Sequence, residues 1–150
     1  MTRMEPIGVI RTPYTRQEEI PIQGRFQPAA EGRVELAPAY RPGLADLAGF
    51  SHAWLLYHLH RSDRVEVRGR PYLEDRPKGI FAIRSPHRPN HIGLSVVRIS
   101  RIEEGLLHFT WVDMLDGTPL LDIKPYVPPF DIVPEATSGW LSAHFESGST

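Results

Sequence analysis

The sequence predicts a mainly β fold, a single-domain and compact β-barrel with short peripheral helices. Fifteen prolines and twelve glycines are spread over 150 residues and leave little room for long helices. The apolar segments between them are short, and most are either continuous or alternate with polar residues, as strands do. Many antiparallel strands in one small domain must protect their edges, and closure into a barrel achieves this.

Eight segments have the residue pattern of strands. They are residues 7–12, 32–36, 53–60, 64–67, 79–83, 93–102, 106–113 and 119–123. Within this set, 95–102 and 106–112 are joined by Glu103, Glu104 and Gly105, and such a short link containing glycine predicts a hairpin.

Two short segments predict helical structure. Residues 43–48 can form one turn before Gly49, and residues 134–145 have a proline at the start and aromatic residues at roughly helical spacing. The small polar residues 147–150 are expected to form a frayed tail, so the folded domain is expected over residues 1–146.

Composition and charge narrow the possible classes of protein. Cysteine is absent, which excludes disulfide bonds and thiol nucleophiles. No apolar run approaches the roughly 18 residues of a membrane-spanning helix, so we expect a cytoplasmic protein that does not contact membranes. The formal net charge of −1 conceals an asymmetry, because residues 61–101 carry +6 and residues 102–150 carry −7. The basic segment can supply phosphate contacts.

A proline-braced polar loop follows the expected strand 79–83. Pro86 and Pro89 fix the backbone φ angle and hold the polar side chains between them in an extended array at little further cost in entropy. These side chains are Ser85, His87, Arg88 and Asn90. The residue types predict the binding of an anionic or polar ligand.

A second dense motif runs from Asp113 to Tyr126. Asp116 and Gly117 form a turn signature, and Asp116 either serves chemistry or only accepts backbone hydrogen bonds in that turn. Asp113, Asp122 and Lys124 flank the turn on strand ends, where paired carboxylates can bind a cation or accept a proton. Tyr126 is either available for stacking or is a core aromatic.

His58 and His60 lie two residues apart in an expected strand and would therefore face the same way, as metal ligands in barrels do. The carboxylate that such a site needs is badly spaced, since Asp63 comes too early and Glu66 too late. We expect no metal.

Taken in order along the chain, four motifs resemble the TsaA/TrmO family of tRNA methyltransferases. They are residues 7–14, residues 50–54, the Arg84-Ser85-Pro86-His87-Arg88-Pro89-Asn90 loop and the 116–126 motif. The resemblance implies a small β-barrel methyltransferase domain, a homodimer that binds S-adenosylmethionine. It also implies methylation of N6 of a threonylcarbamoyladenosine next to the tRNA anticodon. Where many relatives have a proline before Ile92-Gly93, this chain has His91, which is expected to free the loop.

The resemblance also implies where the cofactor binds. Carried over by motif, its contacts fall on Arg84, Leu94, His60, Arg61, Thr110, Trp111, Val112 and Asp113, and on the loop of Gly24, Arg25 and Phe26. S-adenosylmethionine presents a carboxylate, a ribose diol, an adenine and a sulfonium, so its site needs an arginine and a carboxylate but no metal.

The N6 atom of an acylated adenosine is a poor nucleophile, and a carboxylate that accepts its proton would raise its reactivity. Asp122 or Asp116 is the candidate base, with Tyr126 against the nucleobase and Lys124 or Arg88 at the substrate's carboxylate. Two alternatives stay open: a binding module that keeps the cofactor site without this activity or with an acceptor other than RNA, and a cupin-like metal barrel.

Overall fold

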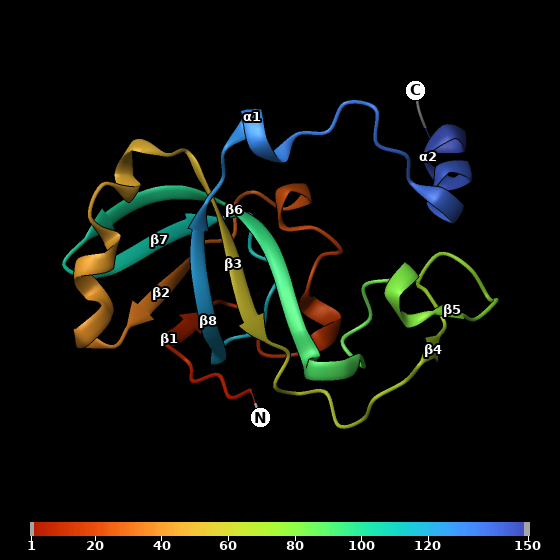
Figure 1. Ribbon diagram of the computed structural model, residues 1–150, viewed down its shortest axis with the longest axis horizontal. Coiled ribbons are helices and arrows are strands. Elements are labelled where there is room, and N and C mark those ends of the chain that lie inside the picture. The colour runs from red at the N-terminus through yellow and green to blue at the C-terminus, as the bar shows by residue number, and fades with distance from the viewer. Residues whose placement is uncertain (1, 149–150) are drawn as a thin grey trace. The chain divides into compact units, whose positions relative to one another are not determined.

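The computed structural model describes residues 2–148 and confirms the mainly β barrel (Figure 1). Six strands close in the order β1-β2-β7-β6-β3-β8, and all neighbours are antiparallel. Their bounds are β1 Gly8–Arg11, β2 Gly32–Leu36, β3 His52–His58, β6 Ile92–Glu103, β7 Leu106–Thr110 and β8 Thr118–Pro125.

Alternation along the strands fills the barrel. In β3, Ala53, Leu55 and Tyr57 are buried, whereas the residues between them face outward. The core that these residues join includes Ile10, Val34, Val97, Leu107, Phe109 and Leu120, all without exposed surface. The alternation of side chains along each strand therefore fixes which residues face the core and which face outward, where a functional site can form.

The predicted hairpin is confirmed as the pair β6–β7. Glu104 and Gly105 have φ angles of 52° and 77°, as the two central residues of a tight hairpin turn require. The predicted strand 106–113 is too long, however, because β7 ends at Thr110.

Short 3₁₀ helices connect the strands. They are η1 Gln17–Glu19, η2 Gly24–Phe26, η3 Pro38–Leu44, η4 Leu47–Gly49 and η6 Pro89–His91. The single turn predicted at 43–48 is replaced by η3 and η4, with Asp46 between them at a φ of 70°.

The contacts divide the chain into two compact units, and residues 67–85 and 127–148 belong to the smaller one. It contains β4 Arg68–Gly69, β5 Lys78–Gly79, η5 Ile80–Ala82, α1 Pro128–Asp131, η7 Gly139–Leu141 and α2 Ser142–Gly148. Within this unit, Trp140 Nε1 donates to the carbonyl of Ala82 (2.8 Å) and His144 Nε2 lies 3.0 Å from Glu74 Oε2. These contacts fix the start of the C-terminal helix to the β4–β5 segment.

Three predicted elements are wrong in detail. The run 79–83 forms η5, because Ile80 and Ile83 are buried at a helical spacing while Phe81 is exposed. Residues 64–67 form no strand; the N–H of Glu66 donates to the carbonyl of His87 in a loop. The predicted helix 134–145 begins only at Gly139, whose φ of 52° precedes α2.

The C-terminal tail expected at 147–150 overlaps α2 at its first two residues, and residues 149–150 lie outside the described residues. Among residues 2–148, no helix is long and apolar enough to cross a membrane.

Candidate functional site

The site begins where β7 ends. Trp111 has a φ of 67°, a left-handed conformation that breaks the strand directly after Thr110. As a result β6 pairs with β7 only from Arg98 to Glu103, and its residues 92–97 have a ladder partner on the β3 side alone. The shortening of β7 thus leaves backbone donors and acceptors of β6 outside the ladder, beside the segment 111–113.

A side-chain hydrogen bond links these two segments. Ser95 Oγ donates to Asp113 Oδ1 at 2.6 Å, and the hydroxyl of Tyr57 lies 2.7 Å from the same Ser95 oxygen. Ser95 directly follows Leu94, whose side chain is 51% exposed. The bond therefore brings together two separately predicted cofactor segments, Leu94 and Thr110–Asp113.

The loop of Gly24, Arg25 and Phe26, the third segment predicted to bind the cofactor, also contacts the chain directly after β7. Gly24 is buried in η2, and a Cβ built on it would lie 2.5 Å from the backbone nitrogen of Val112 and closer still to the carbonyl of Trp111. Only a glycine permits this backbone approach. The next residues are exposed: the Arg25 guanidinium lies over the Phe26 ring, 5.6 Å from its centroid.

His60 and Arg61 follow β3. The predicted strand 53–60 is too long, since β3 ends at His58 and the N–H of His60 bonds to the carbonyl of His58. His58 and His60 are thus not ligands on one strand face, and no group of three potential metal ligands occurs among the described residues. Burial, and secondarily Arg61, lowers the pKa of His60.

The outer face of β8, β3 and β6 carries the predicted reaction residues. Asp122 is in register with Leu56, and Leu56 with Leu94, so the three side chains form one row across the sheet. Lys124 lies in the next row, opposite Trp54. Asp122 and Leu94 are two strand spacings apart, about 10 Å.

Aromatic rings border these rows. The ring centroid of Tyr126 lies 5.5 Å from that of Trp54 and 6.2 Å from that of His52, and His52 lies 4.7 Å from Trp111. Tyr126 is half-buried and not part of the core, and this cluster of rings links it to Trp111 in the predicted cofactor segment. Burial, with Arg98 as a second cause, lowers the pKa of His52.

The proline-braced loop docks on residues 59–66. His87 Nδ1 hydrogen-bonds Ser62 Oγ at 2.7 Å, and His91 Nε2 donates to the carbonyl of Arg64 at 2.9 Å. The loop is not uniformly extended, because Asn90 and His91 have φ angles of 64° and 48°. His91 does not free the loop as expected; its own backbone and ring bonds hold it.

Other predicted residues are placed as follows. Arg88 precedes η6 in the barrel unit, whereas Arg84 and Ser85 belong to the smaller unit, and their assignments stay predictions.

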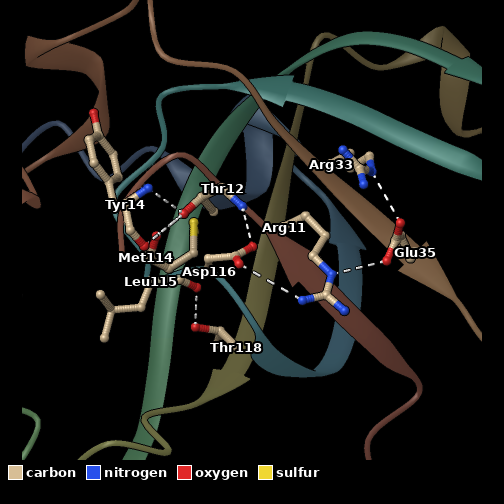
Figure 2. A network of polar contacts seen from close by, with 9 residues as sticks. All are labelled: Arg11, Thr12, Tyr14, Arg33, Glu35, Met114, Leu115, Asp116 and Thr118. Carbon is tan, nitrogen blue, oxygen red and sulfur yellow. Dashed lines mark hydrogen bonds and ion pairs between the residues drawn. The ribbon is translucent and has the colours of Figure 1, made fainter. Parts of the chain in front are cut away.

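Asp116 has a different setting from Asp122 (Figure 2). Its Oδ1 accepts from the backbone N–H of Thr12 at 3.1 Å, and its Oδ2 lies 3.9 Å from Arg11, which also pairs with Glu35. Asp116 lines a hollow of about 530 Å³ beside β1 and β2, and Asp122 lines another of about 490 Å³ with Tyr40 and Phe50. The structure thus separates the two candidate bases and gives Asp116 a role in holding the turn.

The sequence interpretation missed Tyr57 and Ser95, which look like ordinary strand residues. The signal that could have found them is a serine at an inward position of β6, where a hydroxyl needs a partner.

Three similar proteins indicate the family. A Pyrococcus abyssi protein named as a probable S-adenosyl-L-methionine-binding protein is 46% identical over 136 residues, which are 91% of this chain and 74% of that protein. A tRNA (adenine(37)-N6)-methyltransferase of Mus musculus is 42% identical over 91 residues, 59% of this chain and 21% of its own length. The crystal structure of TrmO from Pseudomonas aeruginosa matches with a TM-score of 0.80 at 41% identity, covering 93% of this chain and 62% of that one.

The chain therefore spans less than two thirds of the Pseudomonas structure and a fifth of the mouse protein. The family model of the tRNA-methyltransferase O N-terminal domain matches residues 9–132. The resemblance drawn from the four motifs is confirmed, and this chain belongs to the family of the tRNA-methyltransferase O N-terminal domain.

Proposed function

We propose that this chain is an S-adenosylmethionine-dependent methyltransferase that acts on N6 of threonylcarbamoyladenosine next to the tRNA anticodon. The observation that carries the proposal is the meeting of three distant segments at one place: Gly24 packs on Trp111, and Ser95, next to Leu94, bonds Asp113. The names of the similar proteins from Pyrococcus abyssi and Mus musculus support the same cofactor and reaction.

The groups at this place suit the cofactor. The Asp113 carboxylate is an acceptor for hydroxyl or ammonium groups, and the backbone of 111–113 lies outside the ladder. Arg61, which the resemblance assigns to the cofactor, is the proposed cation. When bound, S-adenosylmethionine supplies an electrophilic methyl group with a neutral thioether as the leaving group.

Asp122 is the proposed base. It faces outward in the same row as Leu94, and its side chain is 48% exposed, so a nucleobase can reach it. Asp122 would accept the N6 proton of the acylated adenosine, with Tyr126 against the base and Lys124 at the substrate's carboxylate. Asp116 is the less suitable base, because it lines a different hollow, beside β1 and β2, and lies outside the row that contains Leu94.

The proposed partners are tRNA and a second copy of this chain. The basic segment 61–101, with Arg88 and Asn90 in the docked loop, can contact phosphates. The second copy is carried over from the resemblance. Light scattering of the purified chain tests the dimer.

The deciding experiment measures methyl incorporation into threonylcarbamoylated tRNA, with tRNA lacking that modification as the control. Calorimetry with S-adenosylmethionine runs in parallel. The proposal expects cofactor binding and methylation of the modified tRNA alone. Absence of binding would overturn the enzyme assignment, and equal labelling of both tRNAs would overturn the substrate.

A second function, cofactor binding without this reaction, is favoured by one observation. Asp122 Oδ1 already accepts from the N–H of Ile123 at 2.8 Å, and Oδ2 lies 3.6 Å from Lys124, so both carboxylate oxygens have partners within this chain. Binding in calorimetry without methylation of either tRNA would select this function.

A further inference from the structure

Two buried hydroxyl groups are linked to the Asp113 carboxylate by hydrogen bonds. Ser95 and Tyr57 are 5% and 6% exposed, so neither hydroxyl has free access to water. The oxygen–oxygen distance from Ser95 to Asp113 is 2.6 Å, as expected for a hydroxyl bonded to a carboxylate, and the distance from Tyr57 to Ser95 is 2.7 Å, as expected for two hydroxyls. Tyr57, Ser95 and Asp113 thus form one series of hydrogen-bonded side chains.

The chemistry of the three groups sets the direction of the two hydrogen bonds. An ionised carboxylate only accepts hydrogen bonds, so the proton between Ser95 and Asp113 comes from Ser95. A hydroxyl has one proton, and Ser95 has then used it. Tyr57 must therefore donate to Ser95, and both bonds point toward Asp113. Donors aligned in this way polarise and strengthen one another.

Tyr57, the first residue of this hydrogen-bonded series, is held rigidly. The Tyr57 ring lies against Gly93, where an added Cβ would come within 2.7 Å of ring atoms Cδ2 and Cζ. Gly93 is the cross-strand partner of Tyr57 in the β3–β6 ladder. The phenol oxygen is thus fixed by the barrel itself, whereas Asp113 follows the point where β7 ends.

We propose that Tyr57 and Ser95 are positioning residues that fix the Asp113 carboxylate for the cofactor. The inference rests on the proposed function and deepens it. The segment beyond Thr110 has left the β6–β7 ladder and is anchored by the buried side chains of Val112 and Met114, while the Ser95 bond orients the Asp113 carboxylate. Without that bond, the carboxylate would have to be oriented as the cofactor binds, at a cost in affinity.

Calorimetric titration with S-adenosylmethionine tests the chain of hydroxyls. We expect Ser95→Ala to weaken binding about 10-fold, the size of a hydrogen bond to a charged group, and Tyr57→Phe to weaken it about threefold. Ser95→Thr keeps the hydroxyl and should restore most of the affinity. Tyr57→Phe should have a smaller effect in a Ser95→Ala background than in the wild type, because the Tyr57–Ser95 bond is already lost there.

Two measurements separate positioning from general stability. Val97→Ala removes volume from the same inward face of β6 and serves as the matched control; it should lower the unfolding free energy without changing cofactor affinity. Hydrogen exchange of residues 111–114 in the protein without cofactor should quicken in Ser95→Ala but not in Val97→Ala.

The outcomes are distinct. Wild-type protein that fails to bind S-adenosylmethionine overturns the proposed function itself. Wild-type binding with unchanged affinity in Ser95→Ala overturns the positioning role alone, as does additivity of Ser95→Ala and Tyr57→Phe. If Ser95→Ala does not fold, equal affinity of wild type and Tyr57→Phe decides against the role.

Discussion

Gly24→Ala is the sharpest test of where the cofactor binds. A Cβ at this position would lie 2.5 Å from the nitrogen of Val112 and nearer to the carbonyl of Trp111, and both are backbone atoms that cannot rotate away. Ordinary contact for such a pair begins near 3.4 Å. The loop around η2 must therefore move by about 1 Å or more away from Trp111.

This movement should weaken the binding of S-adenosylmethionine. A misplacement of about 1 Å in a positioning group can cost about 100-fold in rate, and we expect S-adenosylmethionine affinity to fall at least 10-fold. The barrel strands do not include this loop, so the unfolding midpoint should change little. Calorimetry gives the affinity and thermal denaturation gives the midpoint.

Gly49→Ala is the matched control, because Gly49 also lies in a 3₁₀ helix but an added Cβ meets nothing within 4 Å. It should bind the cofactor as the wild type does. Equal affinities of Gly24→Ala, Gly49→Ala and wild type would refute the placement of the cofactor beside the η2 loop.

Three further predictions concern the carboxylates. Asp122→Asn should lower methyl transfer by 10²- to 10⁴-fold with cofactor affinity unchanged, and a loss of less than about threefold in a single-turnover assay would remove Asp122 as the base. Asp116→Ala should lower the unfolding free energy by about 1 kcal/mol, and Asp116→Asn should lower it by less, since an amide oxygen still accepts from Thr12. Urea titration measures both changes. A large loss of methyl transfer in folded Asp116→Asn would contradict this structural role. The hydrogen bond from Arg11 lowers the pKa of Glu35, so the stability that this carboxylate adds is present above about pH 4.5 and is lost as the pH falls through its lowered value. Melting curves of wild type and Glu35→Gln should therefore converge in acid, and a difference that grows below pH 4 would show the opposite sign.

The barrel was predictable because its signals are local. Alternating burial marks β2, β3 and β8, and the Glu104-Gly105 turn marks the β6–β7 hairpin with the positive φ angles that such turns need. The apolar run 79–83 misled, because a continuous apolar run fits a buried strand as well as a helical turn, in which Ile80 and Ile83 share one face. Short apolar runs do not distinguish the two periods.

The site was predictable only in part, because what creates it is an exception to strand pattern. Residues 106–113 read as one continuous strand, yet Trp111 adopts a φ of 67° that a bulky residue seldom takes. That conformation ends the β6–β7 ladder and leaves Asp113 outside it, where its carboxylate accepts from the Ser95 hydroxyl. A regular β7 continued to Asp113 would occupy the edge of β6 beside Leu94 and leave no backbone groups for a ligand. The left-handed Trp111 is thus the local departure from barrel geometry on which the proposed cofactor site depends.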